Sequence, residues 1–555
     1  MTAAAPDAQK RWLFGPVPDL LFGCGGAYAL LLLVLCAVGP DLRTHQTAWL
    51  FPALVLASSL PHYGATLVRV YEHARDRSRY RLFTVHATLA ILALVAIALR
   101  APIVGCWLAT FYVNWSPWHY AGQNYGLGLM FLRRRGIDPT PREKRLLWSS
   151  FLLSTGIAFL TLNVALSGPV GALGLLSGND VHLITLGIPV AIVAPLGLAL
   201  IAAYVATLGV ALASLAGRAA LATLAPTLAL VVSQALWFSL PLGLRFLPLP
   251  VAIDPFRPEY RDYYFVWIAV AHAVQYLWVT AYYARASSDF RGYGRFYGKT
   301  LLAGCGAWAL PIVLLSPLAA RSMSYDSGLA LLVASAVNVH HFLLDGAIWK
   351  LRGGRVAQIL IRSERSDESD PGEASGALRV FGRRLVWGVL AAAFAIQGFV
   401  LWHRDHVFSA AMARHDYDTA ALALDRLAWL GYDDAGSRTA LGMGFADAQR
   451  IDAALAQLER SITLRPTVPA LAAVGDVRMR QGDAIGARRI YERALTLGPG
   501  SADLFAAAGR AALASGDAAG ARELVLRAEH SAAAPSPSLE SLRRALAENA
   551  ARVGY

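Results

Sequence analysis

The stretch NVHHFLLDGAIWK, residues 338–350, ends a long apolar run and decides what kind of fold this chain can form. The residues before it, from 328, are rich in Leu, Val and Ala, which is typical of a helix that spans a lipid bilayer. Ionisable side chains are costly inside a membrane. The adjacent His340 and His341, with Asp345 four residues later, therefore predict a functional site within a spanning helix.

The composition of the whole chain favours a membrane protein. Of its 555 residues, 56% are hydrophobic and 16% are charged, and the mean hydropathy is +0.45. Ordinary soluble domains carry about 25% charged residues. The four cysteines form no CxxC or CxxCH pair, which argues against a disulfide framework, a thiolate zinc site and covalently attached haem.

Apolar runs of about twenty residues, the length that crosses a bilayer, predict an all-α, polytopic membrane bundle of about eleven spans. The first run begins near Leu20 without a small-residue cleavage site, which favours an anchor over a removed signal peptide. Pro195 lies in the long sixth run, where it could kink or split the helix. The expected spans are residues 19–40, 47–71, 82–99, 102–132, 146–167, 184–214, 219–241, 260–286, 299–317, 328–350 and 379–402.

Basic residues in alternate loops predict the orientation of the bundle. Lys and Arg cluster at 72–81, 133–145, 284–299 and 350–384, whereas the loop 168–180 carries none. By the positive-inside rule, we expect a bacterial-type inner-membrane protein with a cytoplasmic N-terminus and a C-terminal domain on the periplasmic side. Much of the net charge of +13 is then topological, so nucleic acid is not an expected partner.

The last part of the chain has a repeated sequence. GDAIGAR (482–488) recurs as GDAAGAR (516–522) at an offset of 34 residues, and LERSITLRP (458–466) aligns with IYERALTLGP (490–499) at 33. A period of about 34 residues is the signature of tetratricopeptide repeats. We therefore expect a membrane domain over 1–402 and a soluble α-solenoid over 403–555. Such a domain docks a protein or peptide partner, and a purely stabilising appendage is the alternative.

Histidines occur at similar depth in four expected spans that run in the same direction. His62, His119, His272 and the pair His340 and His341 lie about 14–21 Å from the cytoplasmic ends of their helices, at about 1.5 Å per residue. This agreement predicts a shared metal or haem site near the middle of the membrane. The alternative is that each histidine only hydrogen-bonds a neighbouring helix.

Each of these histidines has a polar companion three or four residues later on its own helix face. The companions are Thr66 for His62, Gln123 for His119, Gln275 for His272 and Asp345 for His341. Such partners hold the second nitrogen of a metal-bound imidazole, and Asp345 could instead be a ligand. Neutral imidazoles with one carboxylate suit iron, zinc or copper, and the residues alone leave this choice open.

Two further features bear on the site. Trp115, Trp118, Tyr120, Tyr125 and Tyr276 flank His119 and His272, where they either line a pocket for a flat or polyunsaturated substrate or form bundle core. Tyr276 joins Asp345 and Gln123 as a candidate catalytic residue. Adjacent helical residues point about 100° apart, so His340 and His341 do not easily bind one ion. His341, aligned with Asp345, is the preferred ligand, and His340 is the alternative or a ligand to a second metal.

Four segments are similar to the motifs of a known family: LPHYGATL (60–67), WHYAGQNYG (118–126), AHAVQYLW (271–278) and VHHFLLDGAIWK (339–350). In order, they resemble the histidine motifs of the bacterial Brp/Blh-type β-carotene 15,15′-dioxygenases. The resemblance implies that one histidine from each segment holds ferrous iron and that a carotenoid is cleaved with dioxygen. Thr66 stands about where the family's first motif has an acid, and the family lacks a repeat domain.

These observations lead to three hypotheses. The first is an integral-membrane, histidine-ligated iron oxygenase acting on a carotenoid-like or other membrane-lipid substrate. The second is a haem b electron-transfer or sensor protein that uses the same histidines. The third is an envelope-assembly or glycan-transfer protein with a repeat docking domain, for which the short loop 39–46 offers only Asp41 as an acidic residue.

Overall fold

The computed structural model describes residues 11–38, 50–72, 74–164, 181–246, 258–287, 290–319, 323–350, 354–363, 377–497, 500–530 and 536–553. In these ranges the regular elements are helices, and the one β-type pairing is an isolated bridge between Val164 and Ile188. This confirms the all-α fold class. The chain forms two compact units, one of residues 1–314 and 331–399 and the other of residues 315–330 and 400–555.

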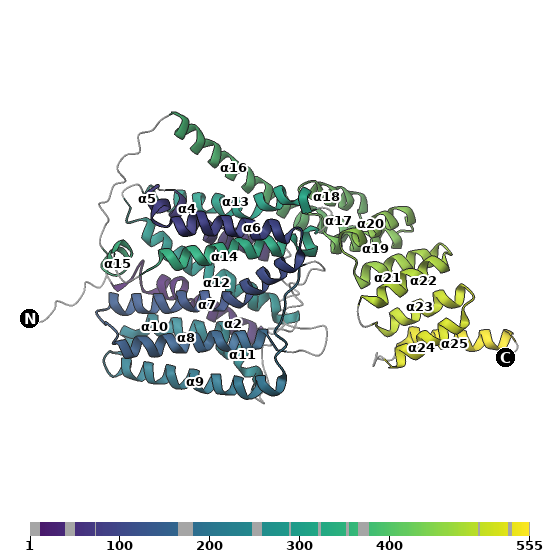
Figure 1. Ribbon diagram of the computed structural model, residues 1–555, viewed down its shortest axis with the longest axis horizontal. Helices are drawn as coiled ribbons and strands as arrows, with labels where there is room; N and C mark the ends of the chain where they lie inside the picture. The colour runs from purple at the N-terminus through teal and green to yellow at the C-terminus, as the bar shows by residue number, and fades with distance from the viewer. Residues whose placement is uncertain are drawn as a thin grey trace, which may run out of the picture. The chain divides into compact units, whose positions relative to one another are not determined.

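The first unit is a bundle of long helices (Figure 1). Several helices contain π-helical turns, labelled η, and η7 is a 3-10 turn. In chain order, the elements up to the end of α16, of which η8 belongs to the second unit, are α1 (Pro16–Pro18), η2 (Asp19–Gly23), α2 (Gly26–Val38), α3 (Leu50–Leu54), η4 (Val55–Ser59), α4 (Leu60–Tyr71), α5 (Ala74–Arg79), η5 (Leu82–Ala87), α6 (Thr88–Ala98), α7 (Pro102–Arg134), α8 (Pro141–Leu162), α9 (Val190–Ala216), α10 (Leu221–Gln234), η6 (Ala235–Ser239), α11 (Leu240–Gly243), η7 (Leu244–Phe246), α12 (Pro258–Ala284), α13 (Tyr293–Ala319), η8 (Tyr325–Leu329), α14 (Ala330–Ile348), α15 (Gly354–Leu360) and α16 (Ala377–Leu401).

Seven helices in the described part of the chain are long and apolar enough to cross a membrane. An eighth is added if Pro16–Gly23 and Gly26–Val38, bent by 66°, form one span. These helices agree with a multi-pass membrane protein. The seven are Pro141–Leu162, Val190–Ala216, Leu221–Phe246, Tyr264–Ala284, Tyr293–Leu318, Tyr325–Ile348 and Val380–Ala413.

The expected count of eleven spans is not confirmed. The apolar helix Leu82–Ala98 is short, and the segments 50–71 and 102–134 are not among the seven helices. Both of those segments contain histidine and other polar residues of the candidate site, which lower their hydropathy. Pro195 does not split its helix, because α9 continues through it to Ala216. The loops 39–46 and 168–180 lie outside the described residues.

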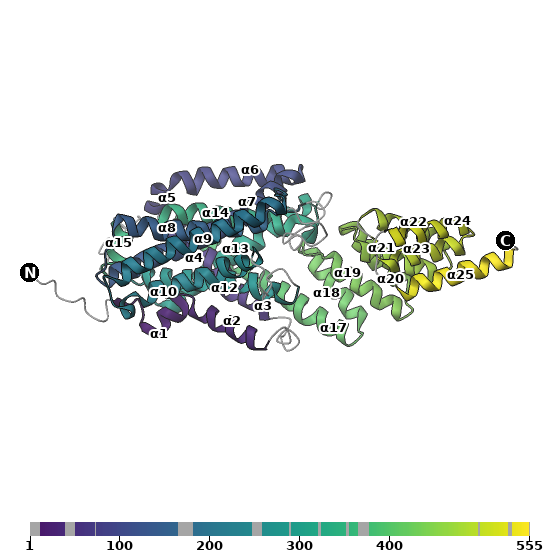
Figure 2. The ribbon, with the colours of Figure 1, turned by 90° about the horizontal axis from the view of Figure 1, so that it is seen from below.

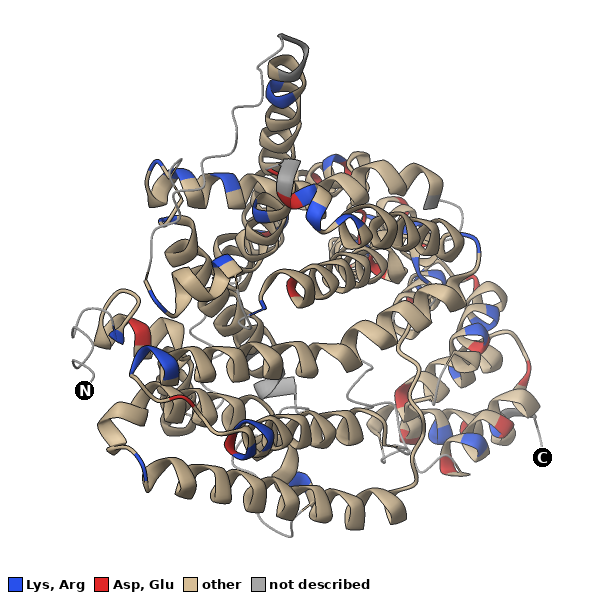
Figure 3. Ribbon diagram, turned by 60° about the vertical axis from the view of Figure 1, so that its left-hand side comes forward, with Lys and Arg blue, Asp and Glu red and all other residues tan. Residues whose placement is uncertain are grey.

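Charged residues are distributed unevenly over the bundle. The long helices carry few charges along their lengths, and many of the Lys and Arg residues lie toward helix ends (Figure 3). The short helices α5 and α15 lie at the same end of the bundle (Figures 1 and 2). The position of these charges agrees with the cost of placing a charge in a hydrocarbon layer.

Two glycines let α4 and α13 approach each other at backbone distance. A Cβ atom added to Gly64 would lie 1.7 Å from the carbonyl oxygen of Thr300, and one added to Gly304 would lie 1.8 Å from that of Leu60. Small residues allow such close helix packing within membranes. Because His62 lies on α4 two residues before Gly64, this contact also positions the first histidine of the candidate site.

The second unit consists of shorter helices packed in succession (Figure 2). From α18 to α24, each helix has 13 or 14 residues. The elements are η9 (Trp402–Phe408), α17 (Ser409–Ala413), α18 (Tyr417–Trp429), α19 (Ala435–Asp447), α20 (Ile451–Leu464), α21 (Val468–Arg480), α22 (Ala484–Thr496), α23 (Ala502–Ala514), α24 (Ala518–His530) and α25 (Pro537–Val553).

The turns of the second unit recur with a fixed spacing. Left-handed backbone occurs at His415, Gln449, Gly482 and Gly516, which are separated by 34, 33 and 34 residues. Each of these residues joins the two helices of one pair, from α17–α18 to α23–α24. A helix–turn–helix unit is therefore repeated four times in the described part of this unit, with the first and least regular copy starting before residue 417.

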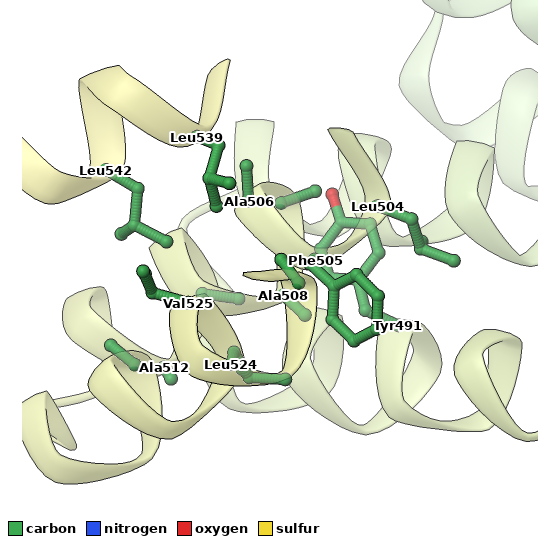
Figure 4. Packing of buried hydrophobic residues seen from close by; sticks show 14 of the residues in the cluster. Tyr491, Leu504, Phe505, Ala506, Ala508, Ala512, Leu524, Val525, Leu539 and Leu542 are labelled. Atoms are coloured by element: carbon green, nitrogen blue, oxygen red, sulfur yellow. The ribbon is translucent and has the colours of Figure 1, made fainter. Parts of the chain in front are cut away.

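The core of the second unit is apolar and rich in alanine. Tyr491, Phe505 and Leu524 are each no more than 5% exposed and pack against small residues of α23 (Figure 4). Leu539 and Leu542 of α25 join the same cluster (Figure 4). Full burial of one such large side chain contributes about 1.5–3 kcal/mol. This unit therefore closes its core with its own side chains.

Candidate metal centre

Four histidines from four separate helices meet inside the bundle. They are His62 on α4, His119 on α7, His272 on α12 and His341 on α14, and one ring nitrogen of each lies within 4.8 Å of the others. The ring centroids of His62 and His341 are 4.2 Å apart, and those of His119 and His341 are 5.2 Å apart. His119 is the least buried of the four, and its side chain is only 9% exposed.

Five ring nitrogens of this cluster lack hydrogen-bond partners within the described part of the chain. Among the described residues, His62 Nε2, His119 Nε2, both nitrogens of His272 and His341 Nε2 are buried without one. A buried polar atom left unpaired costs about 1–3 kcal/mol, so five such atoms in one place require an explanation. A metal ion fits this donor set, because neutral imidazole nitrogens are common metal ligands. The four histidines could therefore bind a metal ion.

Asp345 lies at the edge of the cluster, one helical turn after His341. Its Oδ2 atom is 3.3 Å from His341 Nε2 and 3.9 Å from His119 Nε2. Its Oδ1 atom accepts hydrogen bonds from the hydroxyl of Tyr276 at 2.7 Å and from Thr66 at 3.0 Å. One carboxylate oxygen is thus held by hydroxyl groups while the other faces the histidines.

Thr66 connects Asp345 to the far side of the His341 ring. Its Oγ1 atom lies 3.0 Å from His341 Nδ1 and 2.6 Å from the hydroxyl of Tyr276. When the Thr66 hydroxyl donates to Asp345, its oxygen can accept a hydrogen bond from Nδ1–H of His341. The imidazole proton then lies on Nδ1, and the lone pair on Nε2 faces the cluster. This is the usual way in which a protein sets the tautomer of a metal-binding histidine.

The expected companions of His62 and His119 contact other partners. Thr66 contacts His341 rather than His62 on its own helix. Gln123 donates from Nε2 to Gln275 Oε1 at 2.5 Å and to the backbone carbonyl of His272 at 3.4 Å. Both side chains lie at helix interfaces, where the nearest acceptor belongs to the neighbouring helix. Gln123 therefore joins α7 to α12, and among the described residues no hydrogen bond links it to a cluster nitrogen.

His340 points away from the cluster. Its Nε2 atom lies 2.8 Å from Thr88 Oγ1 and 3.4 Å from the hydroxyl of Tyr71. In the described part of the chain, no second group of potential ligands surrounds it. The rotation of about 100° between adjacent helical residues explains why only His341 reaches the other histidines. His340 is thus a hydrogen-bonding residue at the interface with α6.

Aromatic rings hold two of the histidines in place. His119 stacks on Phe342 at 4.2 Å, and His272 stacks on Tyr120 at 4.0 Å. Trp118, in contrast, is 41% exposed, and Tyr125 packs against Trp148. Of the aromatic residues expected near the site, Tyr120 and Tyr276 contact the histidine rings directly, whereas Trp118 and Tyr125 do not line it.

Two neighbours of the cluster were not expected from the sequence. Tyr63 has its ring 4.8 Å from that of His62 and donates to Asn338 Oδ1 at 2.6 Å. Trp349 donates from Nε1 to the hydroxyl of Tyr276 at 3.1 Å. Asn338 could have been noticed as a polar residue within an expected span one turn before His341. Trp349 carries no such signal, since Trp near a span end is common.

Comparison with known proteins identifies no relative: no family model matches the chain, and no curated protein matches its sequence. The fold and the site together define a helical, multi-pass membrane-type protein with a buried cluster of four histidines that could bind a metal ion.

Proposed function

We propose that this chain is an integral-membrane oxidoreductase in which His62, His119, His272 and His341 hold one ferrous ion. The observation that carries the proposal is the convergence of four buried imidazoles, each with at least one ring nitrogen that has no hydrogen-bond partner among the described residues. Four protein ligands close a tetrahedral zinc site. On a six-coordinate iron they leave positions open, which suits an oxygenase.

Bound iron would supply the activation of dioxygen for oxidation of a lipophilic substrate. The surrounding residues have separate tasks. Asp345 balances the positive charge of the ion, Thr66 sets the tautomer of His341, and Tyr276 holds the Asp345 carboxylate in place. A cavity of about 50 Å³ beside His341, lined in part by Tyr63 and Thr66, has room for a molecule the size of water.

A carotenoid-like or lipid substrate is supported by the position of the least buried histidine. His119 lies on α7, and the exposed side of this helix carries Trp107, Phe111 and Trp118. A substrate dissolved in the bilayer would reach the cluster along this face. The similarity of the four histidine segments to the Brp/Blh-type motifs supports the same substrate class, with Thr66 and Gln123 in place of acidic residues.

Haem b is a weaker fit to the same histidines. The ring centroids of His62 and His272 are 4.9 Å apart, and those of His119 and His272 are 5.1 Å apart. A porphyrin held by two histidines must lie between them, and the packing of all four rings leaves no such slot. Phe342 and Tyr120 occupy the outer faces of two of the rings. A non-haem metal ion therefore suits this cluster better than haem b does.

We further infer a bacterial-type inner-membrane location, with the N-terminus in the cytoplasm and the second unit in the periplasm. The segments 19–40, 47–71, 82–99 and 102–132 would then complete eleven spans. The periodic left-handed turns at His415, Gln449, Gly482 and Gly516 support a tetratricopeptide-type solenoid. Its task would be to dock a protein or peptide partner.

The test compares two adjacent residues in the full-length protein purified in detergent. We expect elemental analysis to find iron in the wild type and in His340→Ala, and to find none in His341→Ala. Oxygen consumption with a carotenoid or polyunsaturated lipid should follow the iron content. Wild-type protein that stays metal-free after expression with added iron would refute the proposal, as would equal iron contents in the two variants. A Soret band in the visible spectrum would instead establish haem.

A further inference from the structure

A second cavity, of about 340 Å³, lies in the first unit away from the histidine nitrogens. Its lining residues lie at the C-terminal ends of α4, α12 and α14 and at the N-terminal end of α13. Residues of α5 and α15 also line it. These two short helices mark one end of the bundle (Figure 1). Pockets of about 300–1,000 Å³ are typical of small-molecule sites. Of the residues described around the histidine cluster, Trp349 also lines this cavity, and the four histidines, Asp345, Thr66 and Tyr276 do not.

The cavity has an excess of positive charge. Six of its lining side chains are cationic and two are carboxylates. Glu72 pairs with Lys299, and Arg383 lies 3.6 Å from the same carboxylate. In the described part of the chain, no carboxylate lies within ion-pair distance of Arg69 or Arg355. The cavity therefore holds more positive charge than its own acidic residues neutralise.

Two of these arginines have a buried donor left unused, and one of them, Arg69, packs on aromatic rings. The guanidinium of Arg69 lies 4.0 Å from the ring centre of Tyr283 and 4.5 Å from that of Trp349. The Nε atoms of Arg69 and Arg355 are buried and have no hydrogen-bond partner among the described residues. A buried donor without a partner is costly, and a guanidinium fixed by aromatic rings is ready to bind an anion.

Membrane topology alone does not account for this arrangement. The positive-inside rule requires Lys and Arg near the ends of spans, and solvated surface side chains satisfy it. It requires neither a cavity, nor an arginine packed on aromatic rings, nor buried guanidinium nitrogens without a partner. A ligand that brings negative charge into the cavity explains all three features.

We propose that this cavity, named here the arginine pocket, binds an anion that carries a phosphate group. Arginine pairs with phosphate oxygens through two parallel N–H bonds, which favours phosphate over a single-point anion. The volume and the rings of Tyr283, Phe296 and Trp349 suit a phosphate joined to a further group rather than phosphate alone. A diphosphate, a soluble phosphate ester and the headgroup of phosphatidic acid share this chemistry.

The experiment uses the full-length protein in two arms that separate these sources. Pyrophosphate is titrated calorimetrically into protein in detergent, as the soluble ligand. Protein reconstituted in phosphatidylcholine vesicles, with and without phosphatidic acid, is then examined for bound lipid by native mass spectrometry. We expect saturable binding in at least one arm. Binding of pyrophosphate indicates a soluble phosphate, and retention of phosphatidic acid alone indicates a lipid headgroup.

Variants connect the binding to the pocket. We expect Arg355→Gln and Arg69→Gln each to weaken binding about tenfold, because each removes a hydrogen bond to a charged group. Arg142→Gln is the matched control, since Arg142 is exposed on α8 and does not line the pocket. If Arg69→Gln fails to fold, Arg355→Gln on α15 carries the test. Absence of saturable binding in both arms, or an equal loss in Arg142→Gln, would overturn the proposal.

Discussion

The histidine cluster of the first unit and the apolar core of the second are both buried, but they differ in what completes them. Around Phe505, the second unit packs alanines of α23 that are almost fully buried and have no polar side-chain atoms to satisfy. Around His62, the first unit buries ring nitrogens that lack partners among the described residues. The apolar core is therefore complete by itself, whereas the histidine cluster leaves buried nitrogens that a metal ion could bind. Substitutions in the two regions should accordingly change different properties.

The largest expected effect lies in the apolar core. Phe505→Ala should lower the stability of the second unit by about 3–5 kcal/mol, because it leaves a cavity among small side chains that cannot fill it. Thermal or chemical unfolding followed by circular dichroism measures the loss. The iron content of the protein should not change.

Leu526→Ala is the control for this substitution, since Leu526 is 54% exposed on α24 of the same unit. An effect of Leu526→Ala as large as that of Phe505→Ala would show that the apolar core does not determine stability as described. Loss of iron in Phe505→Ala would contradict the independence of the two regions.

The contact between α4 and α13 should be nearly as sensitive. Gly64→Ala places a methyl group against the carbonyl oxygen of Thr300, which cannot rotate away. We expect a cost near the upper end of the about 1–3 kcal/mol typical of overpacking. Because α4 carries His62, iron content should fall as well.

The matched control is Gly346→Ala on α14, where an added Cβ meets no atom within 4 Å. Elemental analysis and unfolding are measured for both variants. If Gly64→Ala keeps its full iron content, the close helix contact does not position His62 for metal binding.

A smaller effect is expected from the hydroxyl group that orients His341. Thr66→Val removes contacts to His341 Nδ1 and to Asp345 Oδ1 with little change in volume. Loss of such a supporting group typically lowers metal affinity about 10–100-fold. Thr88→Val is the matched control, because Thr88 contacts His340 outside the cluster. Competition with a chelator measures the metal affinity of both variants. Similar affinities would show that Thr66 does not support metal binding.

The smallest effect concerns the helix caps of the repeated turns. The backbone N–H groups of Gly486 and Gly520, followed by nearby arginines, hold the pKa values of Asp483 and Asp517 below their ordinary value. A carboxyl whose pKa is lower in the folded state adds stability above its unfolded pKa of about 3.9, and this stability is lost as pH falls through the folded value. The second unit should therefore lose thermal stability in this acidic range.

Asp517→Asn should reduce this pH dependence, because the amide cannot titrate. Glu548→Gln, which removes an exposed carboxyl on α25, is the control. Unfolding temperatures between neutral and acidic pH are compared for the three proteins. A pH dependence that is the same in Asp517→Asn and wild type would exclude the caps as its cause.

The candidate site shows which parts of such a centre can be predicted from a sequence. Histidine at one depth on four helices led to the expectation that His62, His119, His272 and one further histidine would meet, and these four lie together. The contacts of the polar companions of these histidines were predicted less well. Spacing by four residues places Thr66 and His62 on one helix face, but it cannot tell which neighbouring helix Thr66 meets.

The sequence alone determined the helical class of this chain, seven of the eleven expected apolar segments and the period of the C-terminal turns, because each depends on residues near one another along the chain. Only the tertiary structure decided that His341 rather than His340 joins the cluster, that Thr66 reaches across to α14, and that Arg69 and Arg355 line one cavity. These outcomes depend on how helices rotate and pack against each other. That packing is set by contacts such as Gly64 against Thr300, between residues far apart in the chain.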